Sequence, residues 1–157
     1  MKNNIFADFL VFAAVLFSTV GAAHAEGVVS LDSDVKVERS VDKDGVKTTV
    51  LSEPNDVIPG DRLVFSTEYN NQGADAVDNF VVTNPLPGAV KLAELDPSFL
   101  VSVDGGKNYA PLSDLTVDVD IVGNRPAELA DVTHIRWVLK RLDPGARGTL
   151  SYQAIVR

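Results

Sequence analysis

The sequence predicts an all-β protein, an antiparallel β-sandwich or barrel of about seven to nine short strands. Segments in which apolar and polar residues alternate recur along most of the chain, and this period of two is typical of a half-buried strand. Proline, glycine and asparagine interrupt these segments at intervals of roughly ten to fifteen residues. No segment of useful length has the apolar period of a helix. Strands that alternate in this way need a second sheet to cover their apolar face.

A hairpin is expected first in the chain, after a loose segment or short edge strand over residues 26–34. Residues 35–41 alternate apolar with charged side chains, as an edge strand should, and residues 46–51 are rich in β-branched residues. Between them, Asp44-Gly45 supplies the positive φ angles that a tight hairpin turn requires.

The clearest strand follows the turn Pro59-Gly60-Asp61, in which proline fixes φ and glycine accepts a left-handed conformation. It ends at the polar turn of residues 70–73. Alternation along this strand places four side chains on its inward face: Leu63, Phe65, Thr67 and Tyr69.

The same reasoning predicts the remaining strands, separated by turns rich in proline, glycine and aspartate and by a polar loop over 123–131 with room for a helical turn around Ala127 to Ala130. The strands are expected at residues 77–83, 89–95, 99–103, 115–122, 132–139 and 150–156. The side chains expected to face the core are Phe80, Val82, Ile135, Trp137, Leu139, Leu150, Tyr152, Ala154 and Val156.

Residues 1–25 have the layout of a cleavable signal peptide. Lys2 supplies the positive charge, an apolar run extends from Phe9 to about Val20, and Ala23-His24-Ala25 has the small-x-small pattern before a cleavage site. The apolar run is shorter than the ~20 residues that cross a bilayer, which argues against the alternative of a membrane anchor. We therefore expect an exported protein, periplasmic or extracellular, whose mature chain is a single domain of residues 26–157.

The overall composition excludes several classes of function. Asp and Glu number 22 against 14 Lys and Arg, for a formal net charge of -8. An acidic chain of this kind is not expected to bind nucleic acid or an anionic membrane surface. The chain has no cysteine, so disulfides, thiolate metal sites and cysteine nucleophiles are excluded.

Several turns resemble those of the bacterial conserved repeat domain, also called domain of unknown function eleven. Pro59-Gly60-Asp61 with the following strand and Asn71-x-Gly73 is similar to the start of these modules, and Leu142-Asp143-Pro144-Gly145 is similar to their closing turn. Asn84-Pro85-Leu86-Pro87 resembles their Asp-x-Leu-Pro segment, with Asn84 in place of the acid. The resemblance covers about residues 50–157. It implies an immunoglobulin-like sandwich on exported bacterial proteins, where such modules are often repeated in tandem, whereas this chain has a single copy.

Two groups of acidic residues were considered as binding sites. Ser102-x-Asp104-x-Gly106-x-x-Tyr109 resembles the Asp-box of sialidase-type propellers, but propeller blades repeat, so a hairpin turn is the expected structure. Calcium takes six to eight oxygen ligands, and aspartates could supply some of them. The candidates are Asp118, Asp120 and Asp131, or Asp32 and Asp34. Because no Asp-x-Asp-x-Asp-Gly loop is present, the alternative is that these aspartates form a solvated acidic face.

Residues suited to catalysis or covalent chemistry are few, and no catalytic, metal-binding or cofactor-binding residue is predicted. Alternation places His134 on the outer face beside Arg136, and no Gly-x-Ser-x-Gly motif accompanies it. Glu53 and Glu68 could form a carboxylate pair for sugar hydrolysis, but alternation places Glu68 on the face opposite Phe65 and no aromatic platform lies nearby, so this chemistry is not expected. Trp137 and Tyr69 are expected to fill the space between sheets.

An isopeptide bond from a lysine to an asparagine would compensate for the missing cysteines, with Lys36, Lys47 or Lys91 as donor.

The function expected from these features is that of a non-catalytic structural or protein-interaction module of the bacterial envelope or extracellular space. Its partners would be other envelope or surface proteins. The edge strand at residues 35–41 offers strand addition, although Lys36, Glu38 and Arg39 would oppose it. The alternative is a glycan- or cation-binding module that uses the end loops 104–114 and 123–131.

Overall fold

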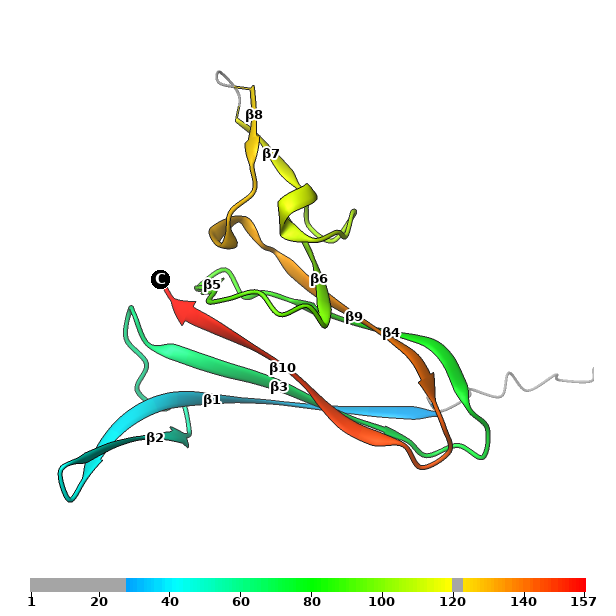
Figure 1. The fold of residues 1–157 in the computed structure, drawn as a ribbon, viewed down its shortest axis with the longest axis horizontal. Coiled ribbons are helices and arrows are strands. Elements are labelled where there is room, and N and C mark those ends of the chain that lie inside the picture. Colours follow the sequence, from blue (N-terminus) through cyan, green and yellow to red (C-terminus); the bar gives the residue numbers. More distant parts are fainter. Residues whose placement is uncertain (1–27, 120–122) are drawn as a thin grey trace, which may run out of the picture.

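The computed structural model describes residues 28–119 and 123–157, and nearly all regular structure in them is β-strand (Figure 1). The all-β prediction is confirmed. These residues form ten strands and two short 3-10 helices, so there are more strands than the seven to nine expected. The predicted signal peptide, residues 1–25, lies outside the described residues. The elements are β1 (Val29–Lys43), β2 (Val46–Ser52), β3 (Arg62–Asn71), β4 (Val77–Pro85), β5 (Val90–Leu92), β6 (Phe99–Ser102), η1 (Leu112–Asp114), β7 (Thr116–Val119), β8 (Gly123–Pro126), η2 (Leu129–Asp131), β9 (His134–Leu142) and β10 (Arg147–Val156).

The strands form three antiparallel sheets. The largest has the order β2-β1-β3-β10-β5, the second has the order β4-β9-β6, and β7 pairs with β8 alone. The first two sheets lie one above the other, and the β7–β8 hairpin projects from the second (Figure 1). This is the antiparallel two-layer arrangement that alternating strands require.

The core lies between the five-stranded and three-stranded sheets. Trp137 of β9 is 2% exposed, and its ring centroid is 6.2 Å from that of Tyr152 on β10 in the other sheet. Phe65 stacks on Tyr152 at 4.8 Å, and Phe99 meets Trp137 edge-on at 5.7 Å. Burial raises the pKa of Tyr152 to about 12. Most of the expected inward positions are confirmed by the buried residues Leu63, Thr67, Val82, Ile135, Trp137, Tyr152 and Ala154, with Phe65, Phe80, Leu150 and Val156 packed against them. Tyr69 and Leu139 were also expected in the core, but both are half-buried and outside this cluster, and the Tyr69 ring lies against Gly148.

The turns that the sequence predicted adopt the geometry their residues favour. Asp44 and Gly45 both have positive φ, 56° and 81°, and connect β1 directly to β2. Gly60 has φ 96° in a turn that the Asp61 N–H closes by donating to the Ile58 carbonyl at 3.0 Å. Gly145 has φ 75° in the turn between β9 and β10. A side chain at these positive φ angles would be strained, which explains the glycines.

Several predicted boundaries need correction. Of the two alternatives for residues 26–34, the edge strand is confirmed from Val29, but it is continuous with the following strand, and β1 pairs with β3 from Val29↔Asn71 to Val37↔Leu63. The strand expected at 89–95 is only Val90–Leu92, the part that pairs with β10. β4 runs on through Pro85, which is tolerated at the last position of an edge strand. The loop expected at 123–131 begins with β8, since residues 123–126 pair with β7, whereas the helical turn expected there is present as η2.

Candidate interaction surface

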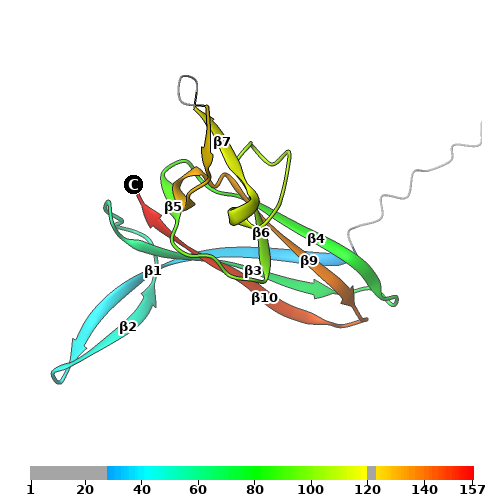
Figure 2. The same ribbon diagram turned by 45° about the horizontal axis from the view of Figure 1, so that its top comes forward.

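The β1–β2 hairpin extends beyond the body of the molecule. β1 pairs with β3 only as far as Val37, and from there to Lys43 it pairs with β2. Every residue from 40 to 51 is exposed. In both views the hairpin stands clear of the three-stranded sheet (Figures 1 and 2).

The core-facing side of β1 continues onto the hairpin without a covering layer. Val37 faces the core and is 1% exposed, and strand alternation places Val41 on the same face, with Val46 and Val50 beside it on β2. These three valines, the hairpin patch, are 45%, 64% and 39% exposed. Apolar side chains on a β-strand normally face a second layer, so this patch is a candidate contact surface.

Ion pairs fix the base of the hairpin. Arg39 Nη1 lies 2.7 Å from Asp61 Oδ1, and the Asp61 carboxylate also accepts the Ile58 N–H at 2.9 Å. That backbone hydrogen bond and the Arg39 pair together lower the pKa of Asp61. Lys36 pairs with Glu53 and lies 3.3 Å from Asp34. The Pro-Gly-Asp turn therefore also anchors the hairpin to the start of β3.

The strand expected to form the sheet edge, residues 35–41, is not the edge. β1 lies between β2 and β3 in the sheet order, and residues 37–41 are paired with β2. The prediction was wrong because the sequence does not reveal that the returning strand adds on the outer side. β2 is the terminal strand.

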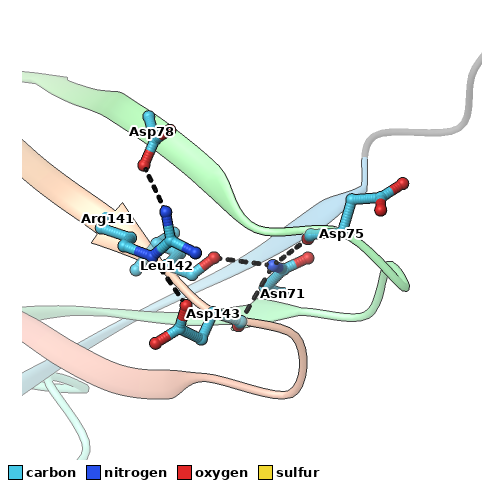
Figure 3. Close-up of polar contacts among 6 residues, drawn as sticks. All are labelled: Asn71, Asp75, Asp78, Arg141, Leu142 and Asp143. Carbon is cyan, nitrogen blue, oxygen red and sulfur yellow. Dashed lines mark hydrogen bonds and ion pairs between the residues drawn. The ribbon is translucent and has the colours of Figure 1, made fainter.

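A second polar cluster joins two turns at the far end of the sheets (Figure 3). Asn71 is fully buried, and its Nδ2 donates to the carbonyls of Asp75, Leu142 and Asp143 at 2.9, 3.0 and 3.1 Å. Its Oδ1 accepts the Gly73 N–H at 3.1 Å. Every polar atom of the side chain is used within the protein, so this cluster is structural.

Arg141 lies on the surface of the same region. It pairs with Asp143 at 2.8 Å and with Asp78 at 3.4 Å (Figure 3). All three side chains are well exposed, and exposed pairs of this kind contribute little to stability.

Two of the other motif positions link the sheets. Asn84, where the resembled modules have an acid, donates from Nδ2 to Thr67 Oγ1 at 3.1 Å. Thr67 is buried, and its hydroxyl also hydrogen-bonds Ser33 at 3.1 Å. An amide is suited to this position because it can supply a proton to the threonine hydroxyl.

The Asp-box-like segment forms a turn closed on itself, as expected. Asp104 accepts hydrogen bonds from Ser102 Oγ at 2.7 Å, from the Lys107 N–H at 3.0 Å, and from both the backbone and side chain of Asn108. These donors, with the Asn108 N–H first, hold the pKa of Asp104 far below its usual range. The carboxylate is thus occupied by its own loop.

His134 and the aromatic residue of the same segment lie next to this turn. The Arg136 guanidinium lies 3.5 Å from the centre of the Tyr109 ring, and His134 Nδ1 is 3.1 Å from Thr133 Oγ1. His134 was expected to be an exposed surface side chain, but it is half-buried beside Gly106. A methyl group on Gly106 would be 3.3 Å from the imidazole ring.

The structure does not gather the aspartates considered for calcium. Asp131 pairs with Arg125 at 2.7 Å, which lowers the pKa of Asp131. Asp118 is exposed on β7, whereas Asp32 and Asp34 lie on β1. Asp120 lies outside the described residues. Within residues 28–119 and 123–157, no group of three or more acidic, histidine or cysteine side chains is placed to hold a metal ion.

The carboxylates weighed for sugar hydrolysis lie apart. Glu53 pairs with Lys36, whereas Glu68 is opposite Asp32 in the sheet. Lys36 and Asp32 are four residues apart on one strand, which corresponds to roughly 13 Å. The structure therefore does not bring the two glutamates together as a pair.

The lysines considered for an isopeptide bond are on the surface. Lys36 is engaged with Glu53 and Asp34, and Lys47 and Lys91 are exposed on β2 and β5. Within the described part of the chain, none of the three hydrogen-bonds an asparagine side chain.

The two end loops meet each other. Leu112 of the first and Leu129 of the second line an open groove of about 520 Å³ together with Leu92 and Ile155. Most of the lining is aliphatic, which suits an apolar group better than the hydroxyls of a sugar.

Comparisons of the chain with protein-family models, with curated proteins and with solved structures find no match. The resemblance to the bacterial conserved repeat domain stays a prediction. In the part of the chain that the structure describes, no helix has the length and apolarity to cross a bilayer.

The residues that sequence reasoning missed are those of the hairpin patch. Each was assigned to a strand, but alternation alone cannot tell whether a layer lies over a given end of a strand. The one available signal is the spread of Val41, Val46 and Val50 around the Asp-Gly turn.

Proposed function

We propose that this chain is an exported, non-catalytic protein-interaction module of the bacterial envelope or extracellular space, and that the β1–β2 hairpin contacts its partner. The observation that supports the proposal most is the exposure of Val41, Val46 and Val50 on a strand pair that projects from the body. Keeping an apolar strand face in water is unfavourable, and a partner that covers it removes that cost.

The proposal includes the immunoglobulin-like fold and the export signal. Two antiparallel sheets packed over a central tryptophan agree with such a sandwich. Export would remove residues 1–25, and the mature chain would begin at Glu26. The mass of the protein recovered from the periplasm or the medium tests this part, because an intact Met1 would contradict it.

The experiment that tests the interaction places a photo-crosslinking residue at Val50 in the native host, with Thr149 as the matched control. Val50 lies on the hairpin, and Thr149 is an exposed position on β10, away from the hairpin. We expect a discrete crosslinked species from Val50 and none from Thr149. Equal yields from the two positions, or no product from Val50, would contradict the assignment of the hairpin.

A further inference from the structure

The partner of the hairpin is specified by the edge that β2 presents. Resting on the proposed interaction function, we propose that this partner is a second copy of the chain, bound by antiparallel pairing of the two β2 strands about Thr49. The two five-stranded sheets would then join into one continuous sheet. The second copy is favoured by the unprotected edge, by the fit of the strand to itself and by the distribution of charge.

The other sheet edges in residues 28–119 and 123–157 have features that hinder strand addition. Residues 147–152 of β10, which β5 does not reach, contain Arg147 and Gly148, and residues 138–142 of β9, which β6 does not reach, contain Lys140 and Arg141. β5, β6, β7 and β8 span only three or four residues each, and Ala110 bridges the open side of β6. β4 contains Pro85 and is distorted at Asn79, where φ is 53°. Short length, proline and distortion are the usual protections of an edge.

The open stretch of β1 is protected by charge instead. Residues 29–36 have no strand on the side opposite β3, and Asp32, Asp34 and Lys36 alternate along them. β2 differs from all of these edges. It has seven paired residues, Val46–Ser52, with no proline, no glycine and a single charged residue, Lys47. An edge of this kind is suited to backbone pairing with another strand.

The strand fits a copy of itself. In an antiparallel pair related by a two-fold axis, the residue on the axis lies opposite its own copy, and the two core-facing sides point the same way. With Thr49 on the axis, Thr48 lies opposite the second copy's Val50, and Lys47 lies opposite its Leu51. No two like charges are opposed. The two hairpin patches lie next to each other on one face, and Val50 of each copy packs beside Thr48 of the other, so pairing covers the side of each patch that faces the seam.

Charge also favours this contact. Residues 37–52 contain three acidic residues, Glu38, Asp42 and Asp44, and three basic residues, Arg39, Lys43 and Lys47, so the hairpin is neutral. The chain as a whole has a net charge of -8, all of which lies outside the hairpin. Two copies that meet at their projecting hairpins therefore bring neutral segments together and keep the acidic bodies apart.

The test uses charge at the two-fold position, measured by sedimentation equilibrium of the exported protein up to about 1 mM, a range suited to a small interface. Wild type should form a dimer. Thr49→Lys should weaken that dimer at least about fivefold, because the introduced lysines oppose each other, and Thr49→Asp should do the same. An equal mixture of the two variants should dimerise at least as well as wild type. Thr149→Lys, the same change at an exposed position of β10 away from the hairpin, should leave dimerisation unchanged.

Three outcomes would overturn the proposal. A wild-type protein that stays monomeric at 1 mM would exclude the second copy as partner. A dimer that Thr49→Lys leaves intact would exclude pairing at β2, and a mixture no tighter than either variant alone would exclude the two-fold register. If the protein is monomeric but Val50 still crosslinks to another protein, the proposed interaction function stands and only the identity of the partner is wrong. Circular dichroism of each variant verifies that the strands are retained.

Discussion

At the scale of single residues, the buried side chain of Asn71 connects two turns. Its amide donates to the carbonyl of Leu142, which lies 71 residues further along the sequence. We predict that Asn71→Asp lowers the free energy of unfolding by about 3 kcal/mol or more, because it would bury a carboxylate against carbonyl oxygens in place of a donor. Urea unfolding followed by the fluorescence of Trp137 measures this. Asn124→Asp, at an exposed position on β8, is the control and should change stability by less than about 0.5 kcal/mol.

Asp104 gives a pH-dependent prediction. Its pKa in the folded protein is lowered from the ordinary 3.8, so folding favours the ionised form. The stabilisation is complete above the unfolded pKa and is lost as the pH falls through the folded pKa, that is, below about 4. We expect the urea midpoint to fall over this acid range, and Asp104→Asn to make that fall shallower. Asp118→Asn, an exposed change on β7, is the comparison, and equal slopes in both variants would contradict the prediction.

At the scale of elements, the pairing of β3 with β10 depends on a glycine. Gly148 lies opposite Tyr69, and a methyl group on Gly148 would be 2.5 Å from the Tyr69 hydroxyl oxygen. We predict that Gly148→Ala costs roughly 1–3 kcal/mol, because the tyrosine ring must leave its place over the glycine. Gly88→Ala, which meets nothing within 4 Å, should cost far less.

The double-mutant cycle with Tyr69→Leu isolates this contact. If the ring causes the cost, Gly148→Ala should be milder in the Tyr69→Leu background, and the coupling should exceed about 0.5 kcal/mol. A cost that is the same in both backgrounds would place the effect in the backbone and contradict the steric explanation.

The elements also show what the sequence could predict. Two-residue alternation located the strands that contain Phe65, Trp137 and Tyr152 and assigned their inward faces, because each has a layer over one side only. The turns at Gly45, Gly60 and Gly145 were identifiable since their positive φ restricts the residue type. The sequence left residues 26–34 open between a loose segment and an edge strand, because the small polar residues before Val35 have little intrinsic strand preference and pairing with β3 makes them a strand.

At the scale of the whole molecule, the arrangement of strands was beyond the sequence. Local patterning does not determine which strands are neighbours. The charged alternation of residues 35–41 therefore predicts an edge strand, although β2 pairs with β1 on its outer side from Val37 onward. The residues of the hairpin patch alternate with polar residues in the same way as those of a buried strand. They are exposed because the three-stranded sheet does not extend over the hairpin. Asn71 illustrates the same limit. The sequence around it predicts a turn, but its side chain is buried because it donates to Leu142, in a turn near the other end of the chain.

The division between a packed body and an exposed hairpin leads to a prediction for the whole fold. Replacing residues 40–49 by an Asn-Gly turn would join Arg39 to Val50, which are already paired. All ten removed residues are exposed, so the free energy of unfolding should change by less than about 1 kcal/mol. Trp137→Ala, which empties the space between the sheets, should by contrast cost about 3–5 kcal/mol.

Urea unfolding followed by far-ultraviolet circular dichroism compares the two variants without relying on the single tryptophan. The shortened protein should unfold near the wild-type midpoint, yet it should have lost both dimerisation and the crosslink from Val50. A large loss of stability in the shortened protein would show that the hairpin supports the body. Its exposed valines would then have a structural role, and the reason for assigning them to a partner would disappear.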